Sequence, residues 1–157
     1  MPLVPNSLAS SLESDWLSKE NGNFPDSVSV SADRFATAFA NWFGGALAGP
    51  GAVSTAAARK SQLASLAIPA LSAQSAQGAG SQLANAIAAY IAGQAFGPGV
   101  AGPPLATSAA GSQIGSVFAD LNATPSARAQ QIASACYTLA SSTIVTFPPP
   151  TPPAPVM

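Results

Sequence analysis

The chain has 157 residues, of which 48% are hydrophobic and only 7% are charged, and its formal net charge is −1. Typical globular proteins carry about 25% charged residues. There is no histidine and one cysteine, and beyond Ser61 the only charged side chains are those of Asp120 and Arg128. These features exclude a Ser-His-Asp triad and argue against a zinc site or a basic surface for nucleic acid.

The chain opens with a short amphipathic helix. Leu8, Leu12 and Trp16 recur at the spacing of one helical face. The run from residue 21 to residue 25, Asn-Gly-Asn-Phe-Pro, then predicts a loop, because asparagine, glycine and proline are typical turn residues.

The second predicted helix carries the main aromatic cluster. Residues 27–31 alternate serine with valine and predict a short extended stretch before it, with Ser31 as the helix N-cap. Gly44-Gly45 is expected to end the helix. Four aromatic side chains fall on one face, which is more typical of a hydrophobic anchor than of a ligand-stacking surface. They are Phe35, Phe39, Trp42 and Phe43.

Two more helices are expected in the middle of the chain. Ser54 or Thr55 is predicted to cap the third helix, in which Pro69 introduces a kink or a break. Gly78-Ala79-Gly80 is predicted to be a joint. A fourth helix follows and is expected to stop at Gly97-Pro98-Gly99.

The sequence of the last third of the chain predicts two further helical units. Pro103-Pro104 opens the first of them. Thr124 and Pro125 form the clearest helix start in the chain, because threonine caps well and proline at the first helical position loses no hydrogen bond. Cys136 lies on the apolar face of the last helix, so we expect a buried small side chain and not a nucleophile.

The C-terminal segment changes character after residue 141. Residues 142–147 are rich in β-branched side chains and run into Pro-Pro-Pro-Thr-Pro-Pro. Proline at this density favours an extended polyproline conformation, which loses little entropy on binding. We therefore expect a docking arm, with a floppy tail as the alternative. The predicted interface residues are Ile144, Val145, Phe147, Pro148, Pro149, Pro150, Pro152 and Pro153.

These segments together predict an all-α fold, a compact bundle of about five to six short helices with an extended Pro-rich C-terminal arm. One helical domain is expected over residues 1–147, and the arm over residues 148–157. The expected core anchors combine the aromatic stripe with apolar residues of the later helices. They are Phe35, Phe39, Trp42, Phe43, Leu83, Ile87, Ile91, Ile132 and Leu139.

No catalytic, metal-binding or cofactor-binding residue is predicted. The chain has no glycine-rich loop that ends in Gly-Lys-Ser or Gly-Lys-Thr, and most of its carboxylates lie in the first 33 residues. Helices rich in Ala, Ser and Gly, with neutral outer faces, are typical of subunits enclosed in a larger assembly. We expect a packing protein that is not an enzyme and has no small-molecule substrate.

Short blocks spread over nearly the whole chain point to a family. They are residues 12–17 (LESDWL), 32–36 (ADRFA), 42–43 (WF), 57–60 (AARK), 89–94 (AYIAGQ), 117–121 (VFADL), 127–133 (ARAQQIA) and 142–149 (STIVTFPP). These blocks resemble those of small, Ala-rich virion structural proteins of contractile-tailed bacteriophages. The resemblance implies an assembly role in the tail, baseplate or neck of a virion assembled in the host cytoplasm. It also implies other virion proteins and copies of the chain itself as partners.

A membrane-interacting helical protein is the alternative. The Ala- and Gly-rich stretch over residues 79–121 would then form an apolar hairpin that inserts into a bilayer. Its best candidate span, residues 83–100, is interrupted by Asn85, Gln94 and a Gly-Pro-Gly turn, and alanine and glycine favour insertion far less than leucine does. We therefore do not expect a transmembrane helix.

Overall fold

The structure is a computed structural model that describes residues 2–17 and 27–157. The loop predicted at residues 21–25 lies outside this range. The helices are α1 (Pro5–Ser11), its π-helical continuation η1 (Leu12–Leu17), α2 (Val28–Phe43), α3 (Lys60–Leu71), α4 (Ala76–Ile91), α5 (Thr107–Ala119) and α6 (Pro125–Ser141). The strands are β1 (Leu47–Ala48), β2 (Gly51–Ala52), β3 (Ala95–Phe96), β4 (Gly99–Ala101), β5 (Ile144–Thr146) and β6 (Ala154–Pro155).

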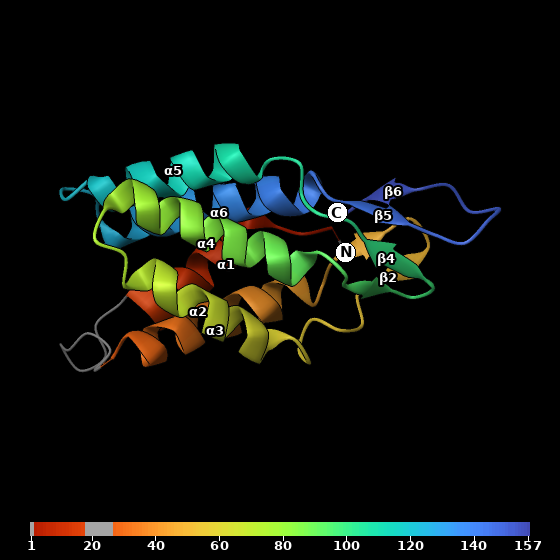
Figure 1. The fold of residues 1–157 in the computed structure, drawn as a ribbon, viewed down its shortest axis with the longest axis horizontal. Helices are drawn as coiled ribbons and strands as arrows, with labels where there is room; N and C mark the ends of the chain where they lie inside the picture. Colours follow the sequence, from red (N-terminus) through yellow and green to blue (C-terminus); the bar gives the residue numbers. More distant parts are fainter. Residues whose placement is uncertain (1, 18–26) are drawn as a thin grey trace.

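The helices form a ring in which each one packs against its neighbours in chain order. The first helix closes this ring, because α1 packs against α6 while η1 lies against α2. Figure 1 shows the helices running side by side, with all the strands gathered at one end of them. The molecule therefore has a helical end and a strand end.

The strands form two small antiparallel sheets that join at both edges. β1 pairs with β2, and β3, β4, β5 and β6 form a four-stranded sheet in that order. An antiparallel bridge joins Val53, which follows β2, to Phe96 in β3. On the other side Ala48 in β1 bridges Val156, which follows β6. The described strands thus close into a small ring, and closure protects backbone groups that open sheet edges would expose. We call these strands and their turns the strand barrel.

A helix followed by a hairpin occurs three times in the described chain: α2 with β1–β2, α4 with β3–β4, and α6 with β5–β6. Helices α3 and α5 follow the first two hairpins, and α1 takes the equivalent place beside α6. Gly49-Pro50 and Gly97-Pro98 form the first two turns, with glycine φ angles of 50° and 59°. A positive φ at the first turn position suits two-residue hairpins. The fold is therefore built from three helix–hairpin units, the last one completed by the N-terminal helix.

The interior of the strand barrel is filled by Phe147 against glycine backbone. A Cβ atom on Gly99 would lie 2.5 Å from two ring carbons of Phe147 and 2.8 Å from Cγ1 of Val145. A Cβ atom on Gly51 would lie 3.2 Å from the same ring and 2.3 Å from the Phe96 carbonyl oxygen. Glycine at these two positions leaves the space that the aromatic ring and the neighbouring backbone occupy.

Aromatic rings connect this barrel to the helical core. The rings of Phe39 and Phe43 stack with centroids 5.8 Å apart, and Phe96 meets Phe43 edge-on at 6.1 Å. Tyr90 packs edge-on against both helical rings. The predicted core anchors are all buried, namely Phe35, Phe39, Trp42, Phe43, Leu83, Ile87, Ile91, Ile132 and Leu139.

The all-α prediction is corrected by the two sheets, although the chain is mostly helical. The expected extended arm over residues 148–157 also differs from the structure, because the chain turns back and β6 pairs antiparallel with β5. Strands of two or three residues are too short to show the alternation that identifies a strand in a sequence. Their stability comes from partners distant in the chain.

Helix α2 begins earlier than predicted, at Val28. Ser27, and not Ser31, is the N-cap, since its hydroxyl oxygen accepts a hydrogen bond from the Val30 N–H at 3.2 Å. The stretch expected to be extended after residue 27 is therefore helical. A serine cap is equally plausible at either position when the sequence is read alone.

Helix α3 also begins later than predicted, at Lys60. Ser54 and Thr55 instead bind the next hairpin unit: the Ser54 N–H donates to the Ala95 carbonyl at 2.9 Å, and the Ala95 N–H donates to the Thr55 hydroxyl at 3.0 Å. These two residues connect the first unit to the second. Pro69 lies in the last part of α3, which continues to residue 71.

Gly78-Ala79-Gly80 lies inside α4 and is not a joint. A Cβ atom on Gly80 would lie 2.2 Å from the Gly115 nitrogen and 2.5 Å from the Gly111 carbonyl oxygen, both in α5. The glycine is therefore needed for close helix contact. Gly97-Pro98-Gly99 belongs to the β3–β4 hairpin and does not end α4, whose last residue is Ile91.

The start of α6 is confirmed. Thr124 caps it by accepting a hydrogen bond from the Ala127 N–H at 3.1 Å, and Pro125 occupies the first turn. Cys136 is fully buried on this helix.

Candidate interaction surface

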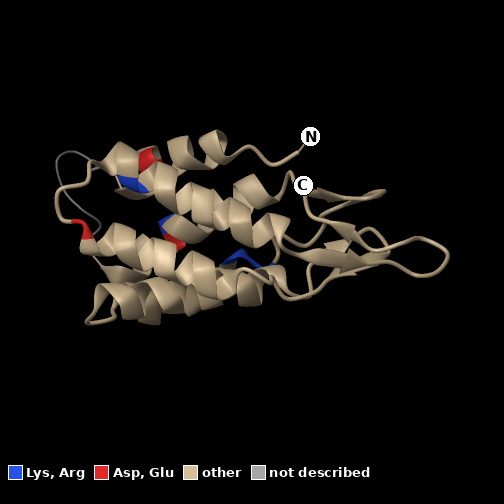
Figure 2. Ribbon diagram, turned by 90° about the horizontal axis from the view of Figure 1, so that it is seen from above, with Lys and Arg blue, Asp and Glu red and all other residues tan. Residues whose placement is uncertain are grey.

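The strand barrel carries no charged side chain in its described strands and turns. Figure 2 shows the blue and red residues over the helices and the segments next to them, with none in the strands or hairpins. A surface without charged groups loses little hydration when another protein covers it. The strand barrel is therefore the natural candidate for a contact surface.

The longest turn of the barrel, residues 148–153, projects from it as a Pro-rich tip. In Figure 1 this blue turn between β5 and β6 reaches furthest from the helices. The Thr151 N–H donates to the Pro148 carbonyl at 3.2 Å, and the Pro149–Pro150 peptide is cis. The five prolines of the tip are exposed: Pro148, Pro149, Pro150, Pro152 and Pro153.

The structure divides the predicted interface residues into two groups. Val145 is fully buried and Phe147 is 6% exposed, so both hold the barrel together from inside. They therefore form the base of the Pro-rich tip and are not exposed contact residues. Ile144 is 41% exposed and remains on the surface with the tip prolines.

Apolar side chains surround Ile144 on the outer face of the sheet. Val100, which is 53% exposed, pairs with Thr146, two residues from Ile144. Since side chains alternate along a strand, Val100 and Ile144 project from the same face. Leu105, just beyond β4, is 82% exposed and its N–H donates to the Ser142 carbonyl. The face therefore presents exposed apolar side chains to a partner.

The two cations that follow the first hairpin, Arg59 and Lys60, form contacts within the fold. Arg59 donates through its two terminal nitrogens to the carbonyl oxygens of Ala92 and Ala89, at 2.8 and 3.2 Å. A cation at the end of α4 complements the helix dipole and satisfies carbonyls that lack helical partners. Lys60 forms an ion pair of 3.7 Å with Asp33 in α2.

A buried polar network joins α4 to the barrel. Gln94 is fully buried; it accepts a hydrogen bond from the Thr55 hydroxyl and donates to the Tyr90 carbonyl at 3.0 Å. The Tyr90 hydroxyl donates to the Ala56 carbonyl at 2.6 Å. Burial raises the pKa of Tyr90 to about 12, against smaller opposing effects of Gln94 and Arg59. Satisfied buried networks of this kind hold neighbouring elements in one arrangement.

The described residues bear on three further functions: thiol chemistry, metal binding and membrane spanning. Cys136 is fully buried, and burial raises the pKa of its thiol well above the ordinary value. Within residues 2–17 and 27–157, no group of three or more His, Cys, Asp or Glu side chains is placed to hold a metal ion. None of the described helices has the length and apolarity needed to cross a bilayer.

A repeated motif in the sequence marks the turns of the barrel. Gly-Pro-Gly occurs at residues 49–51 and again at 97–99, each time after a helix, and the Pro-rich run follows the third such helix. If these motifs are interpreted only as helix ends, the hairpins are not predicted. Read as a repeat, they indicate three turns at the same end of the fold.

Comparisons of the chain with protein-family models, with curated protein sequences and with solved structures find no match. The interpretation of the surface therefore depends on its own geometry and chemistry.

Proposed function

We propose that this chain is a structural subunit of a bacteriophage virion, in the tail, baseplate or neck, and that it docks through the strand barrel. The observation that carries the proposal is the combination of a projecting Pro-rich tip, exposed apolar side chains and no charged group in the barrel. The blocks that resemble virion structural proteins support the same role.

The physical argument concerns the cost of covering a surface. A charged group that loses water on assembly needs a matched partner, whereas proline rings and aliphatic side chains do not. The tip is tied to the barrel at both ends by β5 and β6, so little conformational entropy is lost when it binds. A subunit of this kind suits permanent contacts with other virion proteins and with its own copies.

Particle composition tests the role directly. Virions purified from the phage or prophage that encodes the chain should contain it in a fixed number of copies, measured by quantitative mass spectrometry. Its abundance in the lysate together with its absence from purified particles would contradict the proposal.

Replacing the tip tests the docking surface. Substituting Gly and Ser for residues 148–153 should leave the helices folded but reduce incorporation into particles. Deleting residues 148–157 would also remove β6 and open the strand ring, so the shorter replacement is the cleaner change. Leu121→Ser, at a residue 85% exposed after α5, is the matched control and should assemble normally.

Liposome flotation separates this role from the membrane-interacting alternative. A virion subunit should stay in the soluble fraction with neutral and anionic vesicles alike. Flotation with either kind of vesicle would favour the membrane function.

A further inference from the structure

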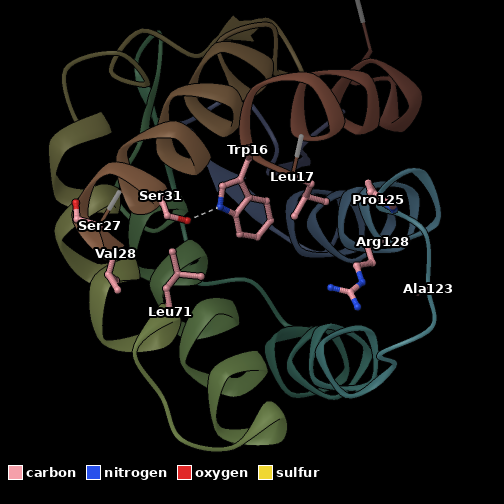
Figure 3. A pocket seen from close by; sticks show the side chains of 9 residues that line it. All are labelled: Trp16, Leu17, Ser27, Val28, Ser31, Leu71, Ala123, Pro125 and Arg128. Atoms are coloured by element: carbon pink, nitrogen blue, oxygen red, sulfur yellow. Dashed lines mark hydrogen bonds between the residues drawn. The ribbon is translucent and has the colours of Figure 1, made fainter. Parts of the chain in front are cut away.

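A cavity of about 490 Å³ opens at the helical end of the molecule. Its walls come from η1, the start of α2, the end of α3 and the start of α6 (Figure 3). Most of the lining is apolar, with one cation and two hydroxyls. The lining residues are Trp16, Leu17, Ser27, Val28, Ser31, Leu71, Ala123, Pro125 and Arg128.

Arg128 is the cation of this cavity, and part of its guanidinium lacks a partner. One terminal nitrogen donates to the Asp120 carbonyl oxygen at 2.8 Å. The Nε–H is buried and makes no hydrogen bond within the part of the chain that the structure describes. Figure 3 shows the guanidinium directed into the space between the helices. A buried donor without an acceptor is costly, and it is rare in native proteins unless a ligand or water supplies the acceptor.

The remaining walls suit an apolar group. The Trp16 indole is oriented by a hydrogen bond of 2.9 Å from its Nε1–H to the Ser31 hydroxyl, and Leu17 and Leu71 complete the apolar surface. No carboxylate of the described residues forms a salt bridge with Arg128. The site therefore offers a cation with a free donor at one side and hydrophobic contact over the rest, which is the usual composition of a ligand pocket.

We propose that this cavity binds a small organic acid, a carboxylate attached to an aliphatic or aromatic group, with Arg128 as its counter-ion. The carboxylate pairs with the Arg128 guanidinium, because guanidinium and carboxylate match in geometry and charge. The apolar part lies against Trp16, Leu17 and Leu71. This site goes beyond the proposed assembly role and does not depend on it.

Three ligands of equal chain length test the proposal: octanoate, 1-octanol and octylamine. They are titrated into the full chain carrying Trp42→Phe, so that Trp16 is the remaining tryptophan and its fluorescence reports on the cavity. Octanoate should bind saturably and about tenfold or more tightly than octanol, since a hydrogen bond to a charged group contributes that much to affinity. Octylamine should bind more weakly than octanol.

Arg128→Met should abolish the preference for octanoate over octanol, and Arg128→Lys should restore part of it. Lys60→Met, which removes a cation from an exposed ion pair elsewhere, is the matched control and should keep the preference. Equal binding of the acid and the alcohol, or no saturable binding of either, would overturn the proposal. So would a large loss of thermal stability in Arg128→Met without acid binding to the parent, which would make Arg128 a structural residue.

Discussion

The strand barrel and the helical end satisfy their polar groups in different ways. In the barrel, short strands pair backbone to backbone around a closed ring, and no charged side chain takes part. At the helical end, the buried Nε–H of Arg128 has no hydrogen-bond partner among residues 2–17 and 27–157 and lies beside a cavity. The barrel therefore satisfies its backbone groups internally, whereas the helical end keeps a buried donor beside the cavity for which we propose a ligand.

The two regions also pack differently. At Gly99 the barrel places an aromatic ring on glycine, and at Gly80 the contact of α4 with α5 places backbone on backbone. A ring at the end of a side chain can shift by a few tenths of an ångström, while two helix backbones cannot move without displacing their whole elements. Substitutions in the two regions therefore measure the stability that each kind of packing contributes.

The largest effect is expected when the barrel loses its central ring. Phe147→Ala should lower the free energy of unfolding by about 3–5 kcal/mol, because it empties the space above Gly99 and removes a buried aromatic group. Ile144→Ala, on the outer face, is the control and should change it by less than about 1 kcal/mol. Urea unfolding measures both. Equal small effects would mean that the barrel contributes little to the stability of the fold.

Alkaline pH should weaken the junction between the two regions. The pKa of Tyr90 rises from 10.0 to about 12 in the folded protein, so between these values only the unfolded chain loses the phenol proton. Stability should therefore be full below pH 10 and fall by about 1.4 kcal/mol per pH unit as pH rises towards 12. Tyr90→Phe should reduce the slope.

Cys136 adds to this alkaline loss in the same direction, since burial also raises the pKa of its thiol. Tyr90→Phe combined with Cys136→Ala should flatten the pH profile further. Denaturant midpoints measured from pH 8 to pH 12 give both slopes. An unchanged slope in the double variant would show that other groups cause the loss.

Added methyl groups should distinguish the two kinds of packing. Gly80→Ala should lower the free energy of unfolding by about 1–3 kcal/mol, towards the upper end of this range. The reason is that the new Cβ would meet α5 backbone at 2.2 Å. Gly99→Ala should cost less, since its Cβ would meet the side chains of Phe147 and Val145 and not the backbone of another element. Gly45→Ala, whose Cβ would have its nearest neighbour at 3.5 Å, is the control. A reversed order in calorimetric melting would contradict the comparison.

The smallest effects on stability are expected when the neighbouring cations Arg59 and Lys60 are replaced. Arg59→Met should cost about 1–2 kcal/mol, because two carbonyl oxygens at the end of α4 lose their donor. Lys60→Met should change stability by less than about 0.5 kcal/mol, since both members of its ion pair with Asp33 are exposed. Raising the salt concentration should reduce the effect of Lys60→Met more than that of Arg59→Met.

Local patterns in the sequence predicted much of the helical part. The aromatic stripe of α2 marks the core, and Thr124 with Pro125 marks the start of α6, because helical periodicity and capping depend on residues close together in the chain. The scarcity of charge beyond Ser61 likewise predicted neutral outer faces for the later helices. These features are properties of the sequence by itself.

The tertiary structure alone decided which distant segments of the chain meet. Residues 154–156 pair with β5 and with Ala48, which lies far away in the sequence, so no local pattern announces the closed ring. The same holds for Gly80, whose role depends on a helix that follows later, and for Arg128, which lines a cavity together with residues of η1, α2 and α3. Local propensity is encoded in neighbouring residues, whereas pairing, close contact and burial are set by which distant segments meet.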